Sequence, residues 1–135
     1  MWLSEQNAAI RRATEGPEVA SVTIPGSSPA VRAGSERRGV TVMAPGGYVW
    51  IPARGEEVVT LTCTTGETVA AGMRQEEAPP GMQPGEVYLH ASGGASVLLR
   101  RTGQIEIHGS VKLTGNVEVT GSLTVNGLPV QVGVE

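Results

Sequence analysis

The sequence is poor in aromatic residues and in cysteine. Its 135 residues include no phenylalanine, and the aromatic side chains are two tryptophans and two tyrosines. Cys63 is the one cysteine, so no disulfide framework can form within the chain, and we expect a small, buried or half-buried side chain rather than a catalytic thiol. With so few large side chains, a single copy could build only a thin core.

Long hydrophobic runs and strong charge are also absent. No stretch of about eighteen apolar residues occurs, and residues 1–7 have neither a basic start nor an apolar run, so we expect no membrane-spanning helix, no secretory signal and folding in the cytoplasm. The net charge is only −3, and the arginines are scattered among acids. This distribution predicts no binding of nucleic acid.

Glycine, by contrast, is abundant and regularly placed. Six glycines recur at six-residue intervals from Gly103 to Gly133, and after each of the first four the second and fourth residues are apolar between polar neighbours. Alternation of period two predicts short strands, and glycine allows the turn between them. The predicted turn glycines are Gly103, Gly109, Gly115, Gly121 and Gly127.

Such a repeat is typical of a β-solenoid, in which units stack on copies of themselves. One chain has too few hexads to close more than about one coil, since a coil takes about eighteen residues. Three identical chains around one axis would share an interior. The predicted trimer core, which extends the alternation back to residue 87, consists of Val87, Leu89, Val97, Leu99, Ile105, Ile107, Val111, Leu113, Val117, Val119, Leu123 and Val125.

The rest of the chain predicts further segments. Residues 3–14 have the pattern of a short helix, which ends near Gly16 and Pro17. Six short strands separated by Pro-Gly and Gly turns follow, over residues 19–24, 28–31, 39–44, 48–51, 58–63 and 68–73. Strands of this size and number are best matched by a five-stranded OB-type barrel.

The predicted fold is therefore all-β apart from the short N-terminal helix. It comprises an N-terminal helical segment (1–16), a small OB-type barrel (17–75), a linker rich in proline and glycine (76–85) and an intertwined, triple-stranded β-helix (86–135). The hexad pattern is imperfect from residue 86 and strict from Gly103. After Gly127 the apolar residues change phase, so the last rung is expected to differ.

This layout resembles the baseplate assembly protein V family, the central spikes of contractile phage tails. The resemblance rests on a barrel segment at residues 47–59, which looks like that family's tryptophan-proline-glycine-glutamate run. It also rests on a C-terminal β-helix with regularly spaced glycines, which ends at residues 120–127. It covers residues 17–127. It implies a homotrimer that docks on baseplate hub proteins and projects a membrane-piercing needle toward the target cell envelope, in a virion tail baseplate or injection particle.

Some family members hold an iron ion at the tip through a histidine-any-histidine pair. This chain has only His90 and His108, eighteen residues apart and expected to face solvent, so no metal site or other cofactor is expected. The apolar, blunt end is instead expected to receive a separate PAAR-repeat cap protein, because an open β edge invites aggregation.

Two other functions compete with the spike. A single-chain β-helix scaffold that polymerises, as in bactofilin-like proteins, would explain the rungs but not the barrel. A hexapeptide-repeat acyltransferase would need more coils and a histidine in a cleft between subunits. The paired acids at residues 56–57 and 76–77 point to opposite sides of a strand or lie in the linker, so no enzyme activity is expected.

Overall fold

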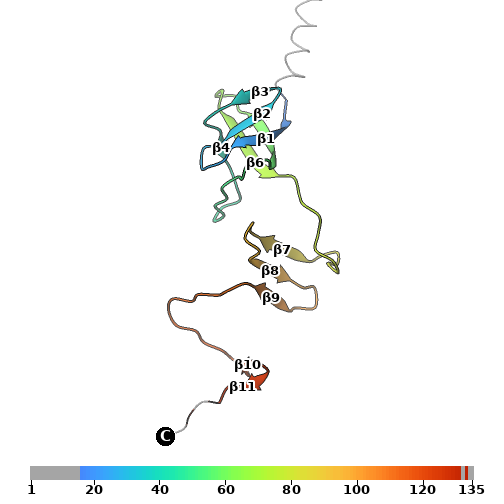
Figure 1. The fold of residues 1–135 in the computed structure, drawn as a ribbon, viewed down its shortest axis with the longest axis vertical. Coiled ribbons are helices and arrows are strands. Elements are labelled where there is room, and N and C mark those ends of the chain that lie inside the picture. Colours follow the sequence, from blue (N-terminus) through green and yellow to red (C-terminus); the bar gives the residue numbers. More distant parts are fainter. Residues whose placement is uncertain (1–15, 132, 134–135) are drawn as a thin grey trace, which may run out of the picture. The chain divides into compact units, whose positions relative to one another are not determined.

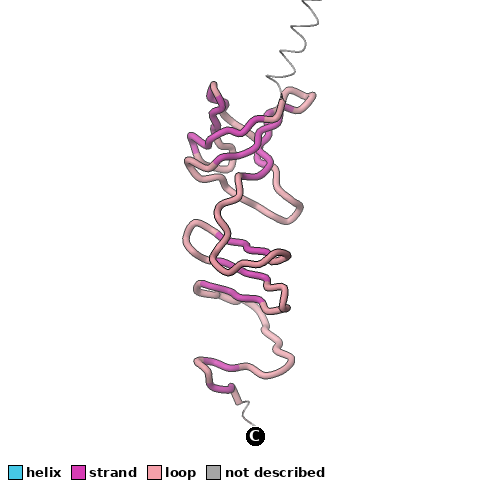
Figure 2. The backbone as a smooth tube through the Cα atoms, turned by 90° about the vertical axis from the view of Figure 1, so that its right-hand side faces the viewer, coloured by secondary structure: helices cyan, strands magenta, loops and turns pink. Residues whose placement is uncertain are grey.

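The computed structural model describes residues 16–131 and 133, and within them the chain is all-β, with strands and loops and no helix (Figures 1 and 2). The predicted helix over residues 3–14 lies outside the described residues. The chain divides into two compact units, residues 1–77 and residues 78–135, and each is described by itself.

The first unit contains one six-stranded sheet. Its strands are β1 (Glu18–Ile24), β2 (Ala30–Ala33), β3 (Ser35–Arg37), β4 (Thr41–Val42), β5 (Glu57–Thr62) and β6 (Thr68–Met73). Their order is β3-β2-β1-β5-β6-β4, in which β4 runs parallel to β6 and the other neighbours are antiparallel. Short strands joined by tight turns are what the spacing of Gly and Pro predicts.

Alternation along the strands creates the core of this unit. In β1, Ala20 and Val22 are buried and alternate with exposed neighbours, and Ala20 pairs directly with buried Val58 of β5. Paired residues lie on the same face of a sheet, so small aliphatic side chains collect on one side. The buried cluster consists of Ala20, Val22, Val31, Val40, Val58 and Ala70, with Ala33, Trp50 and Met73 packed against it.

The sheet curls so that its edge strand β3 contacts β5 and β6, which are not its neighbours in the sheet order. The guanidinium of Arg37, in β3, donates to the hydroxyl oxygens of Thr62 and Thr68 at 3.2 Å each. Thr62 ends β5 and Thr68 begins β6; in the sheet order two strands lie between β3 and β5, and three lie between β3 and β6. These contacts give the sheet strong curvature.

One predicted strand is wrong and one was missed. Residues 48–51 form no strand but belong to a loop, in which Val49 is 95% exposed and the amide of Tyr48 donates to the carbonyl of Pro45. The flanking prolines and glycines favour turns over ladder pairing. The missed strand is β3, whose polar residues lie at the sheet edge and carry no alternation of apolar side chains.

The second unit begins with a three-stranded antiparallel sheet and ends with a hairpin. The sheet has the order β7 (Val87–His90), β8 (Ser96–Leu99) and β9 (Ile105–His108), and the hairpin joins β10 (Thr124–Val125) to β11 (Leu128–Pro129) (Figure 1). Both motifs are paired within one copy of the chain.

The sheet has a nine-residue repeat. Gly85, Gly94 and Gly103 precede its strands with φ of 88°, 91° and 93°, and the amides of Gly94 and Gly103 donate to carbonyls three residues earlier. Positive φ at these positions suits glycine, which has no Cβ to clash. The hexad pattern predicts an imperfect first part of the β-helix in this stretch. It is a meander instead, because nine residues provide both a four-residue strand and a five-residue turn.

Candidate assembly surface

The six predicted core residues in the meander lie on a single face of its sheet. Val87 pairs with Leu99, and Leu89 pairs with Val97. Leu99 and Val97 pair in turn with Ile105 and Ile107 of β9. Since directly paired residues point to the same side, these six aliphatic side chains form one continuous apolar face.

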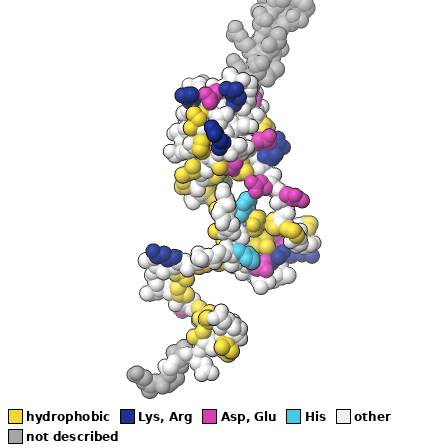
Figure 3. Space-filling view, in the orientation of Figure 1, with side chains coloured by type: hydrophobic (Ala, Val, Ile, Leu, Met, Phe, Trp, Pro, Cys, Tyr) yellow, Lys and Arg dark blue, Asp and Glu magenta, His cyan; other side chains and the backbone are white. Residues whose placement is uncertain are grey.

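Within a single copy this apolar face is largely uncovered. Ile105 and Ile107 are 62% and 59% exposed, and only Val97 of the six is less than about a third exposed. Figure 3 shows apolar side chains at the surface of the second unit. Contiguous exposed apolar surface marks a site of association. The face is therefore suited to contact another protein surface.

Between β9 and β10 the hexads repeat one backbone conformation. Gly109, Gly115 and Gly121 have φ of 129°, 124° and 119°. The apolar residues between them, Val111, Leu113, Val117 and Val119, are all exposed in the single copy. The turn glycines thus repeat one range of φ at six-residue intervals, but the residues between them form no strand within their own chain.

The backbone of this segment is also without partners. Over the described range, no backbone hydrogen bond joins residues 110–122 to another part of the chain. Peptide groups need hydrogen-bond partners once they are removed from water. Strands from other chains would supply such partners and cover the apolar side chains in the same step.

The positive φ of Gly115 yields a prediction. Gly115→Ala is expected to lower the free energy of unfolding by about 1–3 kcal/mol per chain, because an L residue is strained at such φ. Within its own chain the cause is conformational, since an added Cβ would meet no atom of that chain within 4 Å. Denaturant unfolding would measure the change. Gly93→Ala is the matched control, with equal space and no positive φ; equal losses in both variants would contradict the argument.

The opposite face of the meander carries polar and charged groups. Tyr88 and His90 stack there with ring centroids 4.9 Å apart, and His90 and His108 flank buried Ser96 in register. Both histidines are exposed, as expected. One face of the sheet is thus apolar and exposed, whereas the opposite face carries the buried residues Ser96 and Leu98 among polar neighbours.

An ion-pair cluster fixes the first strand of the meander to its turns. The Glu86 carboxylate, only 3% exposed, accepts from the amides of Gln83 at 2.7 Å and Arg101 at 3.1 Å, and from the guanidinium of Arg100 at 3.2 Å. Arg100 also donates to Glu106 at 2.9 Å. The amide of Gln83, followed by the contacts from Arg101 and Arg100, holds the pKa of Glu86 below its ordinary value of 4.5.

This lowered pKa predicts an acid-sensitive second unit. A depressed carboxylate pKa in the folded state stabilises the fold above pH 4.5, and the contribution is lost as pH falls through the lower, folded-state pKa. Glu86→Gln is expected to flatten that part of the stability profile below pH 4.5. Thermal unfolding across pH would show it; Glu76→Gln, in the exposed linker, is the control. Parallel profiles for wild type and Glu86→Gln would contradict this role.

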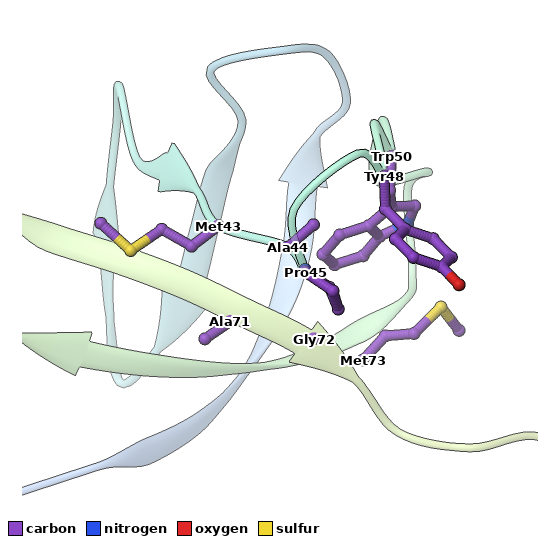
Figure 4. A pocket seen from close by; sticks show the side chains of 8 residues that line it. All are labelled: Met43, Ala44, Pro45, Tyr48, Trp50, Ala71, Gly72 and Met73. Atoms are coloured by element: carbon purple, nitrogen blue, oxygen red, sulfur yellow. The ribbon is translucent and has the colours of Figure 1, made fainter.

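The first unit carries an apolar groove that sequence analysis did not identify. It has a volume of about 640 Å³ and is lined by Met43, Ala44, Pro45, Tyr48, Trp50, Ala71, Gly72 and Met73. Figure 4 shows the rings of Tyr48 and Trp50 close together near Met73. The signal for this groove in the sequence is the apolar run at residues 48–51 in the loop after β4, which the sequence pattern instead predicts to be a strand.

The described residues assemble no other site. They contain no group of three or more His, Cys, Asp or Glu side chains that could hold a metal ion. Cys63 is a half-buried free thiol. None of the described residues belongs to a helix long and apolar enough to cross a membrane.

The apolar face of the meander and the exposed aliphatic side chains of the hexads are suited to contact another protein surface. Comparison with known proteins found neither a family model nor a curated protein that matches this chain.

Proposed function

We propose that the protein is a structural, homotrimeric spike of a contractile phage tail or a related injection system, with an OB-type barrel followed by a triple-stranded β-helix. One observation carries this proposal. The aliphatic side chains of the meander share one face of its sheet, and those of the hexads recur at a fixed spacing, yet all of them except Val97 are exposed in a single copy. The apolar side chains of such a surface are removed from water only when other copies cover them.

Burial energies support coupling of folding and assembly. A fully buried Val, Leu or Ile contributes about 1.5–3 kcal/mol, and each chain has eight such residues in its hexads. A lone copy gains little of this energy because the side chains stay in water. Trimerisation and folding of the hexads are therefore one event that depends on protein concentration.

Three chains suit the six-residue period better than one. In a three-sided solenoid each hexad forms one side, so successive hexads of a chain pass to successive sides while the other two chains fill the gaps. Each of the hexad strands then finds hydrogen-bond partners in neighbouring chains, which its own chain does not supply within the described range. The resulting shaft is stiff and transmits force along its axis.

The first unit is proposed to be the docking module. Its curled sheet and buried aliphatic cluster support an OB-type barrel, and its apolar groove near Trp50 supports a protein partner, here the baseplate hub. The spike would assemble in the host cytoplasm, become part of the virion or injection particle, and meet the target envelope transiently. It would act mechanically and not as an enzyme.

Oligomer mass tests the proposal directly. Light scattering on the full chain is expected to give about 42 kDa, three times the 13.9 kDa of one copy. A well-ordered monomer would refute the spike. Open-ended filaments under the electron microscope would favour the bactofilin-like scaffold instead.

A further inference from the structure

The apolar residues change parity at the turn between β10 and β11. In the hexads every core residue has an odd number, up to Leu123 and Val125, whereas Leu128 and Val130 are even. Asn126 and Gly127 form the turn, with φ of 51° and 77°. Positive φ at both central residues defines the type I′ turn typical of Asn-Gly hairpins.

A two-residue hairpin explains the parity change. Val125 pairs directly with Leu128, and Thr124 pairs with Pro129. The amide of Val130 donates to the carbonyl of Leu123 at 2.8 Å, which extends the pairing by one step. Leu123, Val125, Leu128 and Val130 therefore share one face, while Thr124 and Pro129 lie on the other.

The apolar face of this hairpin is uncovered in a single copy. Leu128 is 70% exposed, and the other three residues are each about half exposed. From the hexad core the face continues without interruption, because Leu123 and Val125 belong to both. Residues 119–131 contain no charged side chain, so three copies can approach one another here without electrostatic repulsion.

We propose that the hairpins of three chains pack on one another through this face and form an apolar plug that closes the hexad solenoid. The plug rests on the proposed trimer, and its partners are the other two copies of this chain. Leu128 and Val130 thereby extend the core beyond the hexads. A separate cap, such as the PAAR-repeat protein expected from the sequence, is not required to cover the last rung.

The outer strand of the hairpin is protected from further pairing. Pro129 lies in β11 and has no amide hydrogen to donate to an incoming strand. Proline on an edge strand is a common means of preventing edge-to-edge association. The hairpin thus both covers the last rung and presents an edge with fewer free donors.

Substitutions on the two faces of the hairpin test the plug in the full chain. Leu128→Asp is expected to leave the trimer mass unchanged, because the hexads remain, but to open the hairpin and raise amide exchange at Val130 at least tenfold. Thr124→Asp, on the opposite face, is the matched control and is expected to keep wild-type exchange. Hydrogen exchange followed by NMR resolves the Val130 amide, and light scattering gives the mass.

The outcomes separate the plug from the trimer. A trimeric Leu128→Asp protein with wild-type exchange at Val130 would overturn the plug and leave the spike intact. Equal exposure of Val130 in both variants would also overturn it, since the effect would not depend on the face. A monomeric wild-type protein would overturn the trimer, and the plug with it.

Discussion

Replacing Val117 with aspartate is expected to leave the protein monomeric. Val117 lies midway along the hexads, is 64% exposed in the single copy, and is placed by the proposed trimer on the common axis. Three carboxylates would then meet in an apolar interior. Burial of an ionised carboxylate without a partner costs several kcal/mol, and mutual repulsion of three adds to that cost.

The free energy of association lost in this variant is expected to exceed what the remaining core residues contribute. Val117→Asp removes three buried valines from the trimer as well, each worth about 1.5–3 kcal/mol. Light scattering at micromolar concentration would show a mass close to 13.9 kDa. Because hexad folding and association are coupled, the part of the far-ultraviolet strand signal that the hexads contribute should be lost in parallel.

Thr120→Asp is the matched control for this experiment. Thr120 belongs to the same hexad as Val117, but it stands at a position of the alternation that is predicted to face solvent. It is expected to remain trimeric, with a change in stability within about 0.5 kcal/mol. A Val117→Asp protein that still forms the trimer would refute the axial placement of the hexad valines.

The hexads could be anticipated from sequence because the constraint there is local. Glycine at every sixth position signals a backbone with positive φ, and Gly109, Gly115 and Gly121 have closely similar values. Alternation between the glycines predicts which side chains share a face, and that part stays a prediction because residues 110–122 form no strand in the single copy. The positive φ of the glycines needs no knowledge of the neighbouring chain, so a single sequence was sufficient for it.

The meander and the loop before β5 could not be anticipated in the same way. In residues 86–108 apolar and polar residues alternate, which fits the strands of a meander as well as those of the hexad solenoid. Only the turn geometry at Gly94 and Gly103 selects the meander, in which the strands pair within one chain. Residues 48–51 are an unbroken run of aromatic and β-branched residues, which also favours a strand. Prolines at positions 45 and 52 and the packing of Trp50 on the core place them in a loop.

The hairpin at the end of the hexads was only half anticipated. A change of phase after Gly127 predicted a different last rung, and the structure has a hairpin there. Asn126-Gly127 between apolar alternations is a strong hairpin signal that would have given the turn type as well. A two-residue turn reverses the parity of the alternation, so Leu128 and Val130 lie on the same face as Val125 and Leu123.

The second substitution with a large expected effect on stability lies in the core of the first unit. Val58→Asp is predicted to unfold this unit while the trimer persists. Val58 is 1% exposed, pairs with Ala20, and belongs to the cluster of small aliphatic residues that forms the core. With about 0.05–0.15 kcal/mol of stability per residue, a unit of about 60 residues has about 3–9 kcal/mol in total.

An unpaired buried carboxylate costs about 3–5 kcal/mol, and the lost valine adds to that, so little or no stability remains. Val59→Asp is the matched control, since the neighbouring side chain points to the other face and is 38% exposed. NMR signals of Val22 and Val31 would report the core, and light scattering would report the trimer. Because assembly depends on the second unit, the mass should stay at three copies even when the core signals are lost. Dissociation of Val58→Asp into monomers would show instead that the first unit holds the trimer together.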